Sequence, residues 1–297
     1  MFCGSMVAIV TPMTADGALD WPAWDRLLDF HVREGTDGIV VAGTTGESPV
    51  LSPGEIEELT HRAVARCRDK VKVIVGAGSH ATDATVARTR TLSRLGVDGV
   101  MLVTPYYNKP PQEGLYRHFM AAADASAAPV ILYNVPSRTA VDLLPSTVAR
   151  LARHPRILAI KEATASLSRA REIVSTCPPE FELLSGDDAT AIDLMGVGAR
   201  GVISVSANVA PRRMHEACSA ALSGDLTGAR TIDATLQPLH KDLFVEANPI
   251  PVKWAVARMG IIGNAIRLPL VELATAHHET VLRAMRAAGV TFEDQAA

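Results

Sequence analysis

Short apolar segments alternate with helix-length amphipathic segments along residues 1–224, and this alternation limits the fold more than any other feature of the sequence. Each short segment is apolar at nearly every position, as parallel strands covered on both faces should be. The expected strands are 5–11, 38–43, 72–78, 99–104, 129–135, 157–163, 182–186 and 201–206. The expected helices between them are 21–34, 53–68, 82–95, 112–124, 145–153, 167–176, 188–197 and 211–223.

Eight strand–helix units favour a (β/α)8 TIM barrel over an open doubly wound sheet, although periodicity alone does not show closure. Beyond Gly224 the alternation stops. Only helices are expected there, near 225–245, 250–259 and 269–288. We therefore predict an α/β chain with a catalytic barrel at 1–224 and a C-terminal helical domain at 225–297.

The composition argues against several classes of partner. A net charge of −3 gives no reason to expect nucleic acid or an anionic membrane. No apolar run approaches the roughly 20 residues of a membrane span, and residues 1–10 lack the features of a signal peptide. The four cysteines are far apart and read as free thiols of a reducing compartment. We expect a cytoplasmic protein.

Lys161 ends the apolar run 157–160, and it is the only one of the six lysines that terminates such a run. Burial disfavours the charged ammonium, so a lysine at this place reaches solvent, pairs with an acid or becomes partly neutral. A neutral lysine is a nucleophile that forms Schiff bases with carbonyl compounds. Its neighbour Glu162 should face the opposite side of the strand and is not a suitable partner. Because TIM barrels carry function at the C-terminal ends of their strands, Lys161 is a candidate covalent catalyst.

Other strand ends bring polar groups to the same predicted barrel mouth. Thr44 and Thr45 follow the second strand in a glycine-bounded turn that can surround a carboxylate with donors, or can be only a tight turn. Tyr133 ends the fifth strand and can transfer protons or simply pack its ring. Arg138 offers a planar fork to a carboxylate unless it is a solvated surface side chain. The pair 187–188, both aspartate, is expected to cap a helix rather than to bind a metal.

Five motifs, in this order, resemble the dihydrodipicolinate synthase family, which belongs to the pyruvate-dependent aldolase and lyase superfamily. They are GTTGES at 43–48, TPYYNKP at 104–110, YNVPSRT at 133–139, IKEA at 160–163 and SGDD at 185–188. The resemblance runs from about residue 4 to about residue 288 and includes 248–254. There, the residues themselves predict only a helix-start turn at Asn248 and a structural role for Lys253.

The resemblance implies an enzyme, usually a homotetramer built as a dimer of dimers, that condenses pyruvate with L-aspartate 4-semialdehyde. The product, 4-hydroxy-tetrahydrodipicolinate, leads to diaminopimelate and lysine. No metal or organic cofactor is implied, because a protonated imine on the lysine is itself the electron sink. The implied roles are the Schiff-base lysine Lys161, the proton shuttle Tyr133, its relay partners Thr44 and Tyr107 (the latter reaching a neighbouring subunit's site), the pyruvate-carboxylate contact Thr45, the aldehyde-substrate contact Arg138, and backbone contributors at Gly186 and Ile203.

The chain departs from the lysine-inhibited members of this family at a cleft near their dimer interface. Ser48 and Tyr106 match those members, whereas His80 and Ala84 stand where they tend to carry Asn and Glu, and Ile56 stands in place of His. Without a carboxylate at position 84, the α-amino group of lysine loses its natural partner. We expect feedback inhibition to be weak or absent.

Two alternatives stay open at this stage. A related lyase acting on a sugar-derived 2-keto acid, such as N-acetylneuraminate or 2-keto-3-deoxygluconate, would share Lys161 and Tyr133. The Ser137–Arg138 and Tyr106–Tyr107 pairs favour the synthase instead. A non-catalytic barrel serving as a ligand sensor would have no need of every expected catalytic residue.

Overall fold

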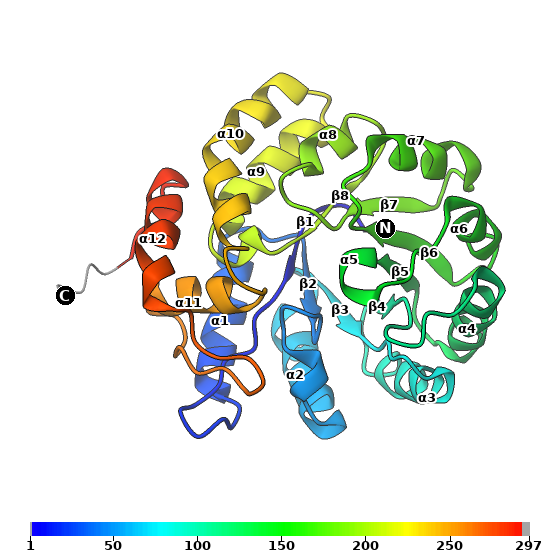
Figure 1. The fold of residues 1–297 in the computed structure, drawn as a ribbon, viewed down its shortest axis with the longest axis horizontal. Coiled ribbons are helices and arrows are strands. Elements are labelled where there is room, and N and C mark those ends of the chain that lie inside the picture. The colour runs from blue at the N-terminus through cyan, green and yellow to red at the C-terminus, as the bar shows by residue number, and fades with distance from the viewer. Residues whose placement is uncertain (1, 293–297) are drawn as a thin grey trace.

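Eight parallel strands close into a barrel in the computed structural model, which describes residues 2–292 (Figure 1). They are Gly4–Ala8 (β1), Gly38–Val41 (β2), Lys72–Gly76 (β3), Gly99–Val103 (β4), Val130–Asn134 (β5), Ile157–Glu162 (β6), Glu182–Ser185 (β7) and Gly201–Ser204 (β8). Each strand pairs with its neighbours in the chain, and β1 also pairs with β8, with Gly4 opposite Gly201. This closure confirms the predicted (β/α)8 barrel and rules out the doubly wound sheet.

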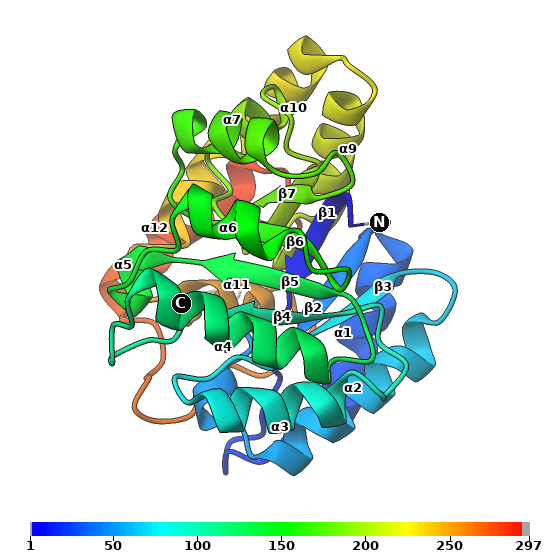
Figure 2. The ribbon, with the colours of Figure 1, turned by 90° about the vertical axis from the view of Figure 1, so that its right-hand side faces the viewer.

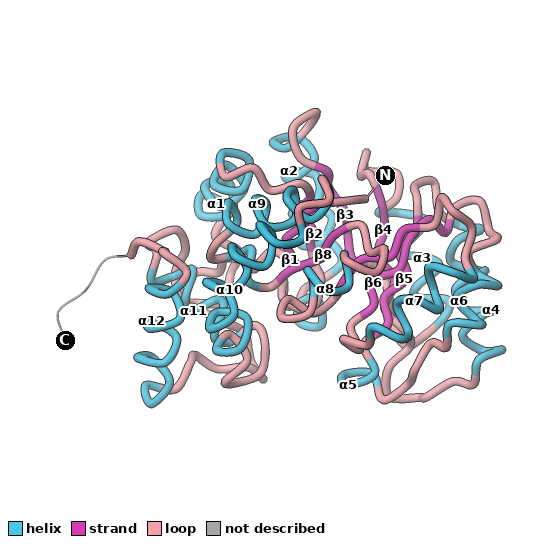
Figure 3. The backbone as a smooth tube through the Cα atoms, turned by 90° about the horizontal axis from the view of Figure 1, so that it is seen from above, coloured by secondary structure: helices cyan, strands magenta, loops and turns pink. Residues whose placement is uncertain are grey.

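Helices surround the barrel, and the tube view shows the strands inside them (Figure 3). The helices of the barrel are Trp21–Arg33 (α1), Pro53–Cys67 (α2), Thr82–Leu92 (α3), Gln112–Ala125 (α4), Pro136–Thr139 (α5), Pro145–Leu151 (α6), Leu167–Thr176 (α7), Ala191–Met195 (α8) and Pro211–Leu222 (α9), with 3-10 turns at Ser48–Val50 (η1) and Ser206–Asn208 (η2). Local chemistry sets several starts. Ser52, for example, forms a capping box with Glu55 at the start of α2.

The C-terminal part is helical, as predicted, and lies beside α1 and α9 (Figures 1 and 3). It consists of Leu226–Asp242 (α10), Ile250–Arg258 (α11), the 3-10 turn Thr275–His277 (η3) and His278–Ala287 (α12). The last helix starts at 278 rather than 269. In the segment before it, Leu268 and Val271 are exposed by 77% and 57%, whereas Leu273 is buried. No helix within residues 2–292 is long and apolar enough to cross a membrane.

Two apolar cores hold the fold together, one between barrel and helices and one inside the barrel. Each strand contributes a side chain to the inner core: Met6, Val40, Ile74, Met101, Ile131, Ala159, Leu184 and Ile203. Because side chains alternate along a strand, Lys161 shares the inward face of β6 with Ala159. Glu162 then faces outward, where Arg169 and Asn134 bind its carboxylate. The predicted separation of Lys161 and Glu162 is confirmed.

Candidate active site

A small pocket of about 130 Å³ opens at the C-terminal ends of the strands. In Figure 2 the arrow of β5 points toward α5 at this end, away from the end marked N. Six of the predicted site residues line the pocket: Thr44, Thr45, Tyr133, Arg138, Lys161 and Gly186. The structure therefore brings together residues that come from four different strand ends, those of β2, β5, β6 and β7.

Lys161 lies at the centre of the pocket's chemistry. Its side chain lies at the end of β6, directly opposite Tyr133 of β5 in the register of the sheet. Burial lowers the pKa of Lys161 to about 8, while the charge of Asp188 raises the pKa and that of Arg138 lowers it further. At pH 7, roughly one lysine in eleven is then neutral, against roughly one in three thousand for an ordinary lysine. Lys161 is thus a usable nucleophile near neutral pH.

Tyr133 lies against the lysine, with its ring centroid 4.5 Å from Lys161 Nζ. Burial raises the pKa of the Tyr133 phenol, while the charge of Arg138 and a hydrogen bond with Thr44 oppose this rise. The phenol therefore stays protonated at neutral pH and is linked to the Thr44 hydroxyl. A phenol and a hydroxyl in contact beside an amine can carry protons to and from a reacting oxygen.

Gly186 follows β7 and leaves the space that Lys161 occupies. A Cβ atom at this position would lie 2.7 Å from Ala163 Cβ and 3.0 Å from Lys161 Cε. Any other residue would therefore displace the lysine or the end of β6. The glycine is needed here for close approach rather than for an unusual backbone angle.

The two aspartates after Gly186 have separate tasks. Asp187 accepts hydrogen bonds from the backbone N–H and the hydroxyl of Thr190, just before α8. Asp188 instead accepts from the N–H groups of Val205 and Ser206, beyond β8. The predicted capping role is therefore wrong for Asp188. This residue stabilises the turn after β8, and its charge raises the pKa of Lys161. Within residues 2–292, no cluster of three or more His, Cys, Asp or Glu side chains could hold a metal ion.

Sequence reasoning missed Asn248 and Phe244, which come from the segment between α10 and α11 and also line the pocket. Asn248 Nδ2 donates to Thr45 Oγ1 at 3.0 Å, and the backbone carbonyl oxygen of Asn248 accepts from Arg138 Nη2 at 3.4 Å. Neither residue follows a barrel strand, so the rule that directs attention to strand ends does not reach them. Only the family resemblance, which includes 248–254, pointed toward this segment.

Two predicted site residues lie outside the pocket lining. Tyr107, in the loop after β4, is 91% exposed and has a left-handed backbone with φ of 74°. It is not among the residues that line the pocket of Lys161. Ile203 belongs to the inner core of the barrel, together with Tyr133 and Ala159.

The residues of the expected regulatory cleft fall into two groups. His80 and Tyr106 are in edge-to-face contact, with their ring centroids 5.2 Å apart. Ser48 and Ile56 line a separate small cavity that also touches Thr44 and Tyr133. That cavity adjoins the pocket of Lys161, because Thr44 and Tyr133, together with Gly43 and Met101, line both.

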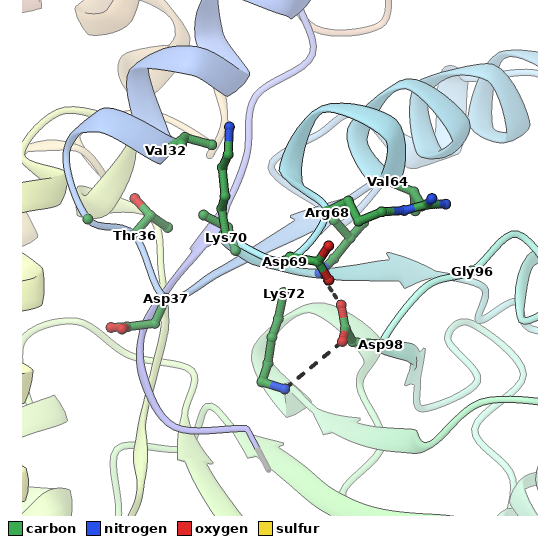
Figure 4. A pocket seen from close by; sticks show the side chains of 13 residues that line it. Val32, Thr36, Asp37, Val64, Arg68, Asp69, Lys70, Lys72, Gly96 and Asp98 are labelled. Carbon is green, nitrogen blue, oxygen red and sulfur yellow. Dashed lines mark hydrogen bonds and ion pairs between the residues drawn. The ribbon is translucent and has the colours of Figure 1, made fainter.

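A larger hollow, of about 640 Å³, lies at the opposite end of the barrel, among the loops that precede β2, β3 and β4 (Figure 4). Lys72 points toward Asp98, with 4.0 Å between Nζ and Oδ1, whereas Lys70 extends elsewhere. Despite its size, this hollow holds none of the groups gathered around Lys161. Conserved function in TIM barrels belongs to the other end, so we do not assign the chemistry here.

Comparisons with known proteins agree with this geometry. The dihydrodipicolinate synthetase family matches residues 1–288. The 4-hydroxy-tetrahydrodipicolinate synthases of Stutzerimonas stutzeri and Nitrosomonas eutropha are 53% and 54% identical, over 98% of this chain and 99% and 100% of theirs. The chloride-inhibited dihydrodipicolinate synthase from Acinetobacter baumannii, solved with pyruvate, has a TM-score of 0.96 and 44% identity, covering 98% of this chain and 100% of that one.

Fold and pocket together define a (β/α)8-barrel enzyme with a buried lysine at the end of its sixth strand. The chain belongs to the dihydrodipicolinate synthetase family. The predicted family and the predicted synthase type of lyase are confirmed, and the sugar-acid lyases are not favoured.

Proposed function

We propose that the protein joins pyruvate to L-aspartate 4-semialdehyde through an imine on Lys161 and forms 4-hydroxy-tetrahydrodipicolinate. One observation carries this proposal. The buried lysine with a lowered pKa shares a small pocket with a phenol, two threonine hydroxyls and an arginine. The pocket suits small acids, since its volume is well below the roughly 300–1,000 Å³ typical of sites for drug-sized ligands.

The first half of the reaction makes the imine. Neutral Lys161 attacks the ketone carbon of pyruvate, whose carboxylate is held by the Thr45 hydroxyl and the N–H groups of Thr44 and Thr45. The N–H groups of Gly46, Glu47 and Ser48 donate to carbonyls within the turn instead. Tyr133, linked to Thr44, donates a proton to the carbinolamine oxygen, which leaves as water. The resulting protonated imine draws electrons from the neighbouring methyl group, so no metal or organic cofactor takes part in the proposed sequence.

The second half forms the new carbon–carbon bond. Tyr133, left as a phenolate by the first half, takes a proton from the methyl carbon to give an enamine. That carbon attacks the aldehyde carbon while Tyr133 returns the proton to the aldehyde oxygen. Arg138 holds the carboxylate of the aldehyde substrate at the mouth of the pocket. The substrate's own amine then attacks the imine carbon, closes the ring and releases Lys161. Gly186 and Ile203 contribute backbone groups near the lysine.

We further propose that the enzyme works in the cytoplasm as a homotetramer, a dimer of dimers. Tyr107 supports this proposal, because an aromatic side chain 91% exposed on a strained backbone is suited to burial against a second copy. In that arrangement Tyr107 would complete the proton relay of Thr44 and Tyr133 in the partner subunit. The described chain by itself supplies the other members of the relay.

Feedback by lysine is proposed to be weak. Ile56 is buried and offers no polar group, and Ala84 provides no carboxylate for an α-amino group. His80 packs edge-to-face against Tyr106 and does not line the cavity of Ser48 and Ile56. An activity curve measured with increasing lysine should stay nearly flat below the millimolar range. Strong inhibition at sub-millimolar lysine would refute this part of the proposal.

Turnover by the purified enzyme tests the main proposal. Pyruvate with aspartate semialdehyde should be consumed at least a hundredfold faster than N-acetylneuraminate or 2-keto-3-deoxygluconate is cleaved. Faster cleavage of either sugar acid would reassign the substrate while keeping Lys161 as the catalyst. No turnover of any of the three would defeat the proposed function.

A further inference from the structure

The Thr45 hydroxyl has a partner that comes from far along the chain. Asn248, between α10 and α11, is buried, and its Nδ2 donates to Thr45 Oγ1 at 3.0 Å. This is the only hydrogen bond of the Thr45 side chain within residues 2–292, and both side chains line the pocket of Lys161. The C-terminal helical part therefore reaches the turn that is proposed to hold the pyruvate carboxylate.

The direction of this hydrogen bond decides what Thr45 can do. A hydroxyl has one proton to donate and two lone pairs that accept. When Asn248 donates to the oxygen, the single Thr45 proton stays free for an anion in the pocket. If the hydrogen bond ran in the opposite direction, Thr45 would donate its only proton to Asn248. Its oxygen lone pairs would then face the substrate carboxylate and repel it.

A buried ion pair holds the same two segments together. Lys253 Nζ in α11 lies 2.5 Å from Glu47 Oε1, two residues after Thr45, and both side chains are 1% exposed. The second Glu47 oxygen accepts from the backbone N–H of Arg267 at 3.2 Å. Burial lowers the pKa of Lys253, and the Glu47 carboxylate opposes that change. Separating the turn from the 248–253 segment would leave a buried charge unpaired, so the ion pair opposes their separation.

We infer that Asn248 is a positioning residue for the first substrate: acting through Thr45, it keeps a hydroxyl proton directed at the substrate carboxylate. The inference rests on the proposed function and adds a residue outside the barrel strands to the site. In this view, the Lys253–Glu47 ion pair keeps Asn248 in contact with the turn that carries Thr45.

Borohydride trapping with pyruvate alone tests the inference, because it measures imine formation without the second substrate. Asn248→Asp replaces the donor by an acceptor and adds a negative charge, so the pyruvate concentration for half-maximal trapping should rise at least tenfold. In the same variant, the amount of enzyme trapped at saturating pyruvate should fall less than threefold. Asn248→Ala, which removes the donor without adding charge, should raise the half-saturating concentration by a few-fold. Asn264→Asp, which adds the same charge at a residue outside the pocket lining, serves as the matched control.

A second pair of variants tests whether Asn248 acts through Thr45. In a Thr45→Val background the hydroxyl is gone, so Asn248→Ala should add less than a twofold effect. If the fold-change in half-saturating pyruvate for the double variant equals the product of the two single-variant fold-changes, Asn248 acts independently of Thr45, and the inference is overturned. Unchanged half-saturation in Asn248→Asp would also overturn it. Failure of the unmodified enzyme to be trapped would count against the proposed function instead, so the two outcomes are distinguishable.

Discussion

At the scale of single residues, the reactivity of Lys161 comes mainly from burial, and charged neighbours adjust it. Burial lowers its pKa to about 8, Asp188 acts against that change and Arg138 with it. Since only the neutral amine attacks a ketone, imine formation should accelerate as the pH rises and level off above about pH 8.

Asp188→Asn should shift this pH profile toward acid. The variant removes a negative charge that raises the pKa of Lys161, and the amide oxygen can still accept from Val205 and Ser206. At pH 7 the initial rate of trapping with pyruvate should rise a few-fold. Asp193→Asn, on the exposed surface beside Arg230, should leave the profile unchanged. A shift toward alkaline pH in Asp188→Asn would contradict the assigned electrostatics.

Arg138→Ala should separate the two half-reactions. The guanidinium is proposed to bind the aldehyde substrate, so kcat/KM for that substrate should fall by two orders of magnitude or more, which corresponds to about 3 kcal/mol. Trapping with pyruvate at pH 7 should fall less than tenfold, through the loss of a positive charge that lowers the pKa of Lys161. Equal losses in both steps would show that Arg138 serves pyruvate as well.

At the scale of elements, the ends of β6 and β7 are packed against each other so tightly that only glycine fits at 186. Gly186→Ala would place a Cβ 2.7 Å from Ala163 Cβ, and neither backbone can yield freely. We expect a loss of about 1–3 kcal/mol in the free energy of unfolding and a trapping rate reduced more than tenfold. Gly54→Ala, where nothing lies within 4 Å of the new atom, is the control for both measurements. Normal trapping in Gly186→Ala would show that Lys161 tolerates displacement.

Pattern and spacing predicted these elements well wherever local sequence decides the structure. The inward and outward faces of β6 follow from strand alternation, so Lys161 and Glu162 could be separated in advance. The role of Asp188 could not be predicted, because its partners are the N–H groups of Val205 and Ser206 at the end of another strand. Asn248 was missed for the same reason, since its partner Thr45 is 203 positions away. Contacts between distant segments depend on how the barrel closes.

At the scale of the whole molecule, the barrel supplies the lysine, and Asn248 of the C-terminal part contacts Thr45 in the turn after β2. A second copy is proposed to supply Tyr107. Mixing two inactive variants tests that last step. Lys161→Ala lacks the nucleophile of its own site. Tyr107→Ala lacks the tyrosine that is proposed to complete the proton relay in the partner subunit's site. Random exchange of subunits should restore about a quarter of the sites, since each mixed dimer has one complete site. Activity that stays absent after exchange, with mixed dimers confirmed by mass, would contradict the shared site.

The central claim is that Lys161 forms the imine. Incubating the protein with pyruvate and borohydride, followed by peptide mass spectrometry, tests that claim most directly. The account predicts one reduced pyruvyl adduct per chain, located on Lys161, and none in Lys161→Ala, whose circular dichroism and Tm should confirm an intact fold. An adduct on another lysine, such as the buried Lys253, or no adduct in the unmodified protein, would contradict the account.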